Sequence, residues 1–267
     1  MVKKALFAIG SIILSIFLLA SSASALTRPT PPSRPIPPPV PEFPEVSGVY
    51  SEPSNPLIRV NVFVHREPTA TVISPLLVCS LDDPESNSIV SEAGWHLPPN
   101  WTYSLNVNSM PQSVGAANLP TIAGNGFTDW VGASNNKVNI ARGVNTTTNR
   151  SRYDGRNIIA WGRTSNGTLG VTYIRYYVSS GLVVDVDTIM NNRVAWSWSN
   201  SNTCADPNAY DAEAILTHEL GHWFGMDDEY DGSYQHATMF GYGSLGEVKK
   251  NTLSTGDKTG VFSIYNP

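Results

Sequence analysis

The chain has few charged residues, few cysteines and few long apolar runs. Charged residues make up 15% of its 267 positions, and the formal net charge is −5 at pH 7. This composition offers no general basic surface, so we expect no nucleic-acid partner. Because there are only 2 cysteines, the chain can form no more than one internal disulfide. Its length is sufficient to bury a sizeable apolar core, so stability does not have to come from disulfides.

The only long apolar run covers residues 5–20, directly after two lysines. It is short for a membrane span, and the sequence Ala-Ser-Ala that precedes Leu26 is typical of a signal-peptidase site. We therefore predict a signal peptide over residues 1–25, a secreted, extracellular protein that begins near Leu26, and no membrane association after cleavage. An uncleaved membrane anchor is the alternative interpretation.

Proline is concentrated in one segment, because residues 29–56 hold eleven of the 20 prolines. Closely spaced prolines cannot donate a regular ladder of backbone hydrogen bonds, so residues 26–56 are predicted to be an extended proline-rich linker or pro-segment. Residues 57–64 then alternate as a strand, and residues 71–79 form a second apolar run. We expect residues 57–89 to be β-like and to belong either to a pro-region or to the N-terminal part of the domain that follows.

Residues 90–267 have the length and pattern of one α+β domain. Runs rich in β-branched and aromatic residues predict strands at 101–107, 157–161, 170–178 and 182–190. A helix is predicted at 116–133, although proline and glycine dilute its pattern. Strands followed by helices indicate a mixed, twisted β-sheet backed by helices. Five tryptophans are expected in the core or in a cleft wall, namely Trp95, Trp130, Trp161, Trp196 and Trp198.

The most informative motif is HELGHWFGMDD, which begins at His218. Two histidines four residues apart project from the same face of a helix, so His218 and His222 can bind one zinc ion. Glu219 lies on the same turn beside the ion, where it can act as the general base on metal-activated water. Gly225 ends the helix and turns the chain back, and Asp228 then falls where the third ligand of such a motif is expected.

The third ligand has rivals. Asp227 and Glu229 are acidic neighbours of Asp228 that would need a different return path to the ion. His236 is the other histidine that lies close to the motif in sequence, and it could replace Asp228 as a ligand. We favour a supporting role for His236, behind the ligands or at the rim of the site, over a role as a ligand.

The motif resembles the extended zinc motif of the metzincin metalloproteases, and the ATMFGY sequence of residues 237–242 resembles the Met-turn of that clan. The resemblance implies that Met239 packs as an apolar floor beneath the zinc ligands. Residues 153–162 and 185–191 resemble sheet strands of the matrixin branch, the second being similar to the edge strand that lines the substrate cleft. Residues 257–265 resemble the closing helix, so a metzincin-like α+β fold with an active-site helix, a Met-turn and a C-terminal helix is implied.

Two positions depart from the matrixin pattern. Most matrixins have histidine as the third ligand, whereas an aspartate, here Asp228, is similar to the snapalysin-like metzincins. Tyr242 follows Met239 by three residues, while metzincins that use a tyrosine to stabilise the tetrahedral intermediate usually place it two residues after the methionine. We therefore favour Tyr242 as a packed wall residue over a role in the transition state.

The two cysteines, Cys79 and Cys204, are expected to form one disulfide, because a secreted chain matures in an oxidising compartment. The alternative is that the Cys79 thiolate binds the zinc ion as an inhibitory switch. The PRCGxPD-like context of matrixin switches is absent around Cys79, and this alternative would leave Cys204 unpaired.

These patterns predict a secreted zinc metalloendopeptidase with one catalytic Zn²⁺, which hydrolyses protein or peptide substrates by direct attack of water. Two alternatives are a hydrolase of other amides and a secreted binding or adhesive protein on an inactive metalloprotease scaffold. Glu219, beside the ligands, argues against the binding or adhesive protein, because a structural metal site needs no base. Ca²⁺ is a further candidate cofactor: Asp185 with Asp187, or Asp82 with Asp83, could help to hold it, but such pairs are usually solvated. The sequence carries no signal for an oligomeric state.

Overall fold

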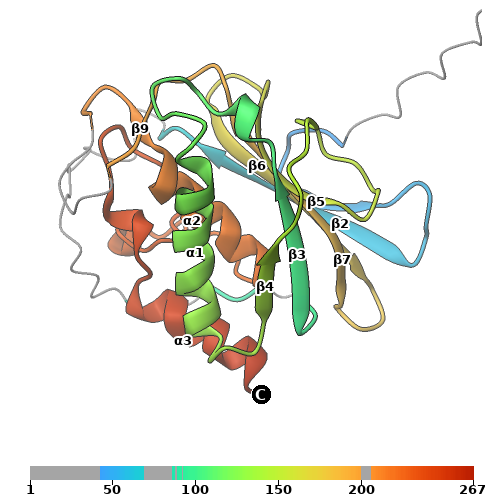
Figure 1. Ribbon diagram of the computed structural model, residues 1–267. Coiled ribbons are helices and arrows are strands. Elements are labelled where there is room, and N and C mark those ends of the chain that lie inside the picture. Colours follow the sequence, from blue (N-terminus) through green and yellow to red (C-terminus); the bar gives the residue numbers. More distant parts are fainter. Residues whose placement is uncertain (1–42, 69–85, 88, 92, 200–205) are drawn as a thin grey trace, which may run out of the picture. The chain divides into compact units, whose positions relative to one another are not determined.

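A computed structural model describes residues 43–267 except 69–85, 88, 92 and 200–205 (Figure 1). The described residues belong to one compact unit, Pro41–Pro267. The predicted signal peptide, the first part of the predicted linker and the apolar run at 71–79 lie outside the described residues, as do Cys79, Asp82, Asp83 and Cys204. No helix within the described ranges combines the length and the apolar character that a bilayer span requires.

The main sheet has seven strands in the order β1-β2-β6-β7-β5-β3-β4. From β7 to β4, each strand is parallel to the next one, whereas from β7 to β1 each strand is antiparallel to the next one. The sheet is therefore mixed, as predicted. Its strands are β1 (Gly48–Ser51), β2 (Ile58–Arg66), β3 (Asn100–Leu105), β4 (Asn139–Arg142), β5 (Asn157–Gly162), β6 (Thr168–Tyr177) and β7 (Val183–Asn191). A second small sheet pairs β8 (Trp196–Ser197) with β9 (Tyr210–Asp211).

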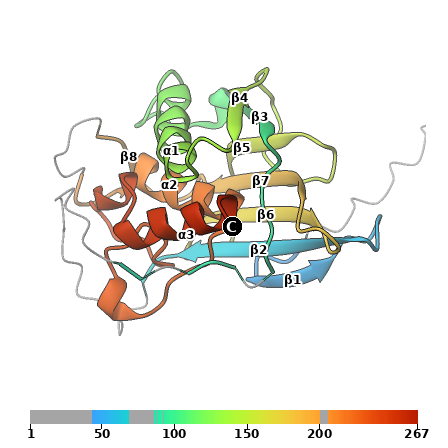
Figure 2. The same cartoon turned by 90° about the horizontal axis from the view of Figure 1, so that it is seen from below.

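Three α-helices gather on one side of the main sheet (Figure 1 and Figure 2). They are α1 (Leu119–Ala133), α2 (Ala212–Trp223) and α3 (Thr255–Tyr265), and the short 3-10 helices are η1 (Val107–Ser109), η2 (Gly232–Tyr234) and η3 (Lys249–Asn251). Helix α2 lies between α1 and the strands β6 and β7, and α3 contacts α1. The class is therefore α+β, and α2 is placed against the centre of the sheet.

Apolar side chains cover both faces of the sheet. The larger core joins the three helices to the sheet and includes Trp95, Trp130, Trp161 and Trp196, with Trp198 packed against it, as predicted. A smaller core on the other face is built from strand residues of β2, β5, β6 and β7. Because successive residues of a strand point to opposite faces, β2 contributes to both cores and is buried along most of its length.

The ends of α2 follow from two residues of its sequence. Asp211 is the N-cap, and its carboxylate accepts hydrogen bonds from the backbone N–H groups of Glu213 and Ala214. Gly225 has a φ of 101°, a conformation that favours glycine, and the N–H of Met226 closes the helix end on the carbonyl of Gly221 at 3.2 Å. The end of this helix before Gly225, which the sequence predicted, is confirmed.

Two expectations about strands were wrong. Residues 185–191 do not form an edge strand, because β7 lies between β6 and β5 in the interior of the sheet. Residues 48–51 form the edge strand β1 inside the segment predicted as a linker. No proline lies within these four residues, and prolines outside an edge strand do not interrupt its ladder. The predicted strand at 101–107 ends at Leu105, before η1.

Candidate metal centre

Helix α2 and the segment that follows it direct three buried side chains to one point. His218 and His222 have no exposed surface, and their Nε2 atoms lie 3.2 and 3.6 Å from Oδ1 of Asp228. Ligand atoms in a tetrahedral zinc site with bonds of about 2.0–2.2 Å lie about 3.3–3.6 Å apart. None of these three atoms has a hydrogen-bond partner in the described part of the chain. Buried polar atoms are rarely left unsatisfied, so this set of donors fits a metal ion.

The other nitrogen of each histidine fixes the orientation of its ring. Nδ1 of His218 lies 2.8 Å from the carbonyl of Thr238, and Nδ1 of His222 lies 3.0 Å from the carbonyl of Met226. Each Nδ1 therefore carries the proton, which leaves the lone pair of Nε2 directed at the centre. Burial lowers the pKa of His218 to about 3 and that of His222 to about 4, so both rings are neutral at physiological pH, as metal ligands must be.

Glu219 lies beside this set, and among the described residues one of its carboxylate oxygens has a hydrogen-bond partner and the other has none. Its Oε2 accepts a hydrogen bond from the hydroxyl of Thr172 on β6 at 2.5 Å, while Oε1 is buried and unpaired. Burial raises the pKa of Glu219 to about 8, the Thr172 hydrogen bond opposes this, and the nearby Asp228 adds to it. A Cβ at Gly170 would collide with the Glu219 carboxylate, so β6 approaches the glutamate closely because position 170 has no side chain.

Met239 packs directly against α2. It is buried, and a Cβ at Gly221 would collide with the sulfur of Met239 and with the ring of Trp130. The glycine between the two histidines therefore makes room for the methionine and the tryptophan. Met239 thus lies against the turn of α2 that carries both histidines.

Two buried lysines fix the segment around Met239. Nζ of Lys249 donates to the carbonyl of His236 at 2.9 Å, and Nζ of Lys250 donates to the carbonyls of Phe240 and Tyr242. Burial lowers the pKa of Lys250, and Glu247 at 3.6 Å opposes this. Sequence reasoning missed both lysines, since lysine is usually exposed.

The structure separates the rivals for the third ligand. Asp228 belongs to the convergent set, whereas His236 is in neither of the two groups of metal-binding side chains found among the described residues. The carboxylate of Glu229 accepts a hydrogen bond from the N–H of Asp231 at 2.7 Å instead. The hydroxyl of Tyr230, which sequence reasoning missed, donates to Oδ2 of Asp228 at 3.0 Å.

Tyr242 is half-buried beside the centre. Its ring packs against those of Tyr230 and Phe240, with centroids 5.5 and 5.8 Å apart. This placement fits the expectation of a packed wall residue.

His65 of β2 also reaches the centre, which the sequence did not indicate. Its ring nitrogen lies within 4.8 Å of ligand atoms of His218 and Glu219, and its ring lies edge-on to that of His218 with centroids 3.9 Å apart. Phe63 stacks on His222 with centroids 3.8 Å apart. The alternation of β2 places residues 63 and 65 on one face, but only the tertiary structure decides that this face meets α2.

The acidic pair on β7 has a different environment from the one expected. Asp185 and Asp187 are buried rather than solvated, and both accept from the guanidinium of Arg175, at 2.6 and 3.2 Å. Glu52 lies 3.3 Å from the same guanidinium. Burial raises the pKa of Asp185 to about 6, and Arg175 opposes this. These carboxylates are directed at an arginine, which leaves them poorly placed to hold Ca²⁺.

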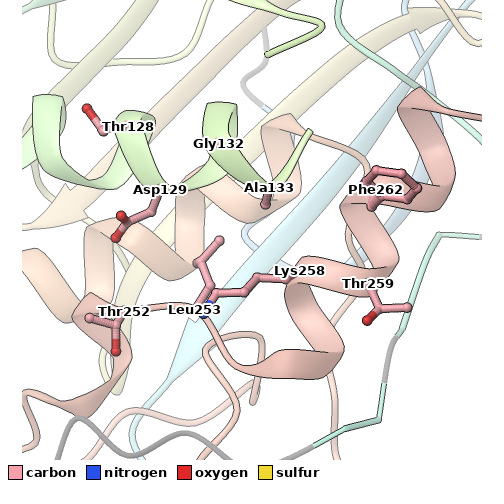
Figure 3. A pocket seen from close by; sticks show the side chains of 9 residues that line it. All are labelled: Thr128, Asp129, Gly132, Ala133, Thr252, Leu253, Lys258, Thr259 and Phe262. Atoms are coloured by element: carbon pink, nitrogen blue, oxygen red, sulfur yellow. The ribbon is translucent and has the colours of Figure 1, made fainter. Parts of the chain in front are cut away.

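A surface hollow of about 640 Å³ lies between α1 and α3 (Figure 3). Its walls include Thr128 and Asp129 of α1 and Lys258 and Phe262 of α3. Burial raises the pKa of Asp129 to about 6. No side chain of the convergent set lines this hollow, so it is separate from the candidate metal centre.

Neither the models of known protein families nor the curated proteins include a match to this chain.

Proposed function

We propose that this protein is a secreted zinc endopeptidase with a metzincin-like catalytic domain, and that it hydrolyses peptide bonds of proteins or peptides. The observation that carries the proposal is the convergence of His218, His222 and Asp228 next to Glu219. In the part of the chain that the structure describes, the three converging donor atoms and one oxygen of Glu219 have no hydrogen-bond partner. The α+β class, the Met-turn against α2 and the closing helix α3 support the metzincin-like fold. The apolar run with its Ala-Ser-Ala site supports secretion.

The residues of the centre have three different roles in the proposed reaction: metal ligand, general base and support for the base. His218, His222 and Asp228 would hold zinc, which when bound supplies Lewis acidity to the peptide carbonyl and acidifies water. Oε1 of Glu219 takes a proton from the attacking water and delivers it to the leaving amine. The Thr172 hydroxyl holds Oε2 and so orients the base. A divalent cation at the neighbouring ligand atoms favours the ionised form of Glu219, which a base requires.

A second candidate function is a binding protein with a structural metal site. The observation that favours it is the closure of the centre, since His218, Glu219 and His222 have no exposed surface. Catalytic zinc sites keep one position open, whereas structural sites are closed by protein ligands. The unpaired oxygen of Glu219 favours the endopeptidase, because a structural site gains nothing from a buried, unpaired carboxylate.

The test is the substitution Glu219→Gln, which keeps the ligands and removes the base. We expect zinc content to stay near one ion per chain, while hydrolysis of quenched-fluorescent peptides falls by about 10²–10⁴-fold. Hydrolysis is measured in the wild-type chain and in a chain with Phe63→Ala and His65→Ala, because these two side chains cover the centre. Zinc-loaded chains that cleave no peptide in either background would contradict the endopeptidase proposal and favour the structural site.

A further inference from the structure

Strand β2 runs across the candidate metal centre between two backbone partners. On one side it is antiparallel to β6, with His65 opposite Gly170. On the other side Arg66 forms a parallel bridge with Tyr242, and the N–H of Gly243 donates to the carbonyl of Arg66 at 3.1 Å. The end of β2 is thus an extended segment clamped between the strand that holds Glu219 and the segment that follows Met239. Backbone pairing of this kind is how proteins bind extended peptides.

The side chains of this segment fill the space over the ligands. Phe63 covers His222 and His65 covers His218, with ring centroids 3.8 and 3.9 Å apart. His65 lies on the side of the centre where Glu219 is located, which is where water and a peptide carbonyl have to be placed. An extended substrate and β2 would therefore need the same space.

His65 is itself without a partner. Its side chain has no exposed surface, and neither ring nitrogen has a hydrogen-bond partner among the residues that the structure describes. A buried polar group without a partner costs roughly 1–3 kcal/mol. Imidazole nitrogen is a preferred ligand of zinc, and a metal at the neighbouring ligand atoms would satisfy this ring.

We propose that β2 occupies the substrate groove of this same chain and that His65 is a zinc ligand of a latent state. The proposal rests on the proposed endopeptidase function. It assigns the β6 edge to extended peptide substrates, which bind as an antiparallel strand in place of residues 63–66. The centre becomes active when β2 leaves the groove and the position taken by His65 opens to water.

The ligand role of His65 is tested on the full chain by zinc affinity and by the visible spectrum of the cobalt-substituted protein. His65→Phe keeps a ring in the same space without nitrogen, so it should weaken zinc binding by at least about tenfold and change the cobalt spectrum. His65→Cys offers a thiolate and should restore tight binding. His96→Ala, a histidine outside the convergent set, is the control and should match the wild type.

The groove role is tested by hydrolysis. The double variant Phe63→Ala/His65→Ala removes both side chains from the centre, and we expect its hydrolysis of quenched-fluorescent peptides to exceed that of the wild type by at least about tenfold. The matched control is Val60→Ala/Val62→Ala, which weakens the packing of the same strand on its opposite face and leaves both rings over the centre. Because a loosened β2 leaves the groove more often, this variant should also raise hydrolysis, but by less than the double variant, which clears both rings from the centre while the strand stays paired.

Three results separate this inference from the proposed function. If His65→Phe keeps the zinc affinity and cobalt spectrum of the wild type while His218→Ala loses the metal, the ligand role is wrong and the endopeptidase proposal stands. If the wild-type chain already cleaves peptides as fast as the double variant, in a Glu219-dependent manner, the latent state is wrong and the function stands. If no chain cleaves peptides although zinc is bound, both proposals fall.

Discussion

At the scale of single residues, Asp228 decides the charge of the candidate centre. The two histidines are neutral, so one carboxylate would leave a zinc ion with a formal charge of +1. Burial raises the pKa of Asp228, and the neighbouring His222 and the hydroxyl of Tyr230 oppose this. The carboxylate is therefore held in a costly position that a cation would stabilise.

We predict that Asp228→Ala lowers zinc affinity by about 100-fold or more, because the site loses its one carboxylate ligand. Asp227→Ala, next to it in the chain, and His236→Ala should each change the affinity by less than about tenfold. Chelator competition at constant pH measures all three variants. Retention of zinc in Asp228→Ala together with its loss in His236→Ala would show that the imidazole is the ligand.

Residues that share a short motif were predictable, and residues that meet only in three dimensions were not. Spacing on one helix and the turn at Gly225 were enough to predict that His218, Glu219, His222 and Asp228 converge. His65, Thr172 and Lys250 come from other elements, and each reaches the centre through strand pairing or a buried loop. Their sequence context is that of an ordinary strand or surface segment, so no local signal marks them.

At the scale of elements, the N-cap residue of α2 makes the stability of the protein depend on pH. The Asp211 carboxylate is buried, and burial raises its pKa to about 6, although backbone N–H groups of Ala214 and Ser199 oppose this. A carboxyl group with a raised pKa in the folded state binds more protons there than in the unfolded state. Its contribution to stability therefore falls as the pH rises from about 4 to about 6, and it is constant above that range.

We predict that Asp211→Asn removes this part of the pH dependence. Relative to the wild type, the free energy of unfolding of the variant should rise by on the order of 2–3 kcal/mol between about pH 4 and about pH 6 and then stay level. Urea unfolding at a series of pH values measures it. Asp231→Asn, which changes an exposed cap residue of η2, is the control. A constant difference between Asp211→Asn and the wild type across this range would contradict the assignment.

Most elements were predictable, whereas their neighbours in the sheet were not. Alternation and β-branched residues located β2, β5, β6 and β7 to within a few residues, and the histidine motif with the glycine after it located α2. The expectation that residues 185–191 form an edge strand was wrong, because β2 and β6 both lie beyond β7 in the sheet. Strand order depends on which long-range pairs form, and the pattern of a single strand does not contain that information.

At the scale of the whole molecule, a metal at this centre would add a direct bond between segments from different parts of the chain. The proposed ligands come from β2, from α2 and from the segment after it. A metal that binds the folded state alone stabilises it by about 4 kcal/mol when its free concentration is 1,000 times its Kd. We predict that removal of zinc with a chelator lowers the Tm by roughly 8–16 °C, at about 2–4 °C for each kcal/mol.

Calorimetry of the zinc-loaded and chelator-treated chain measures this shift. His218→Ala is the control, and its Tm should not respond to the chelator because the site is already broken. An equal loss of Tm in both chains would mean that the chelator acts elsewhere.

The position of β2 also has a consequence for the order of events in folding. His218, His222 and Asp228 lie close together in the chain, whereas His65 must arrive by pairing β2 with β6, which are separated in sequence by β3, α1, β4 and β5, and such long-range pairing is a slow step. A metal ion can therefore be captured by the local ligands before the strand closes over them. Once β2 is in place, exchange of the ion with solvent requires the strand to open, so the same feature that blocks the groove would also act as a kinetic barrier that retains the metal.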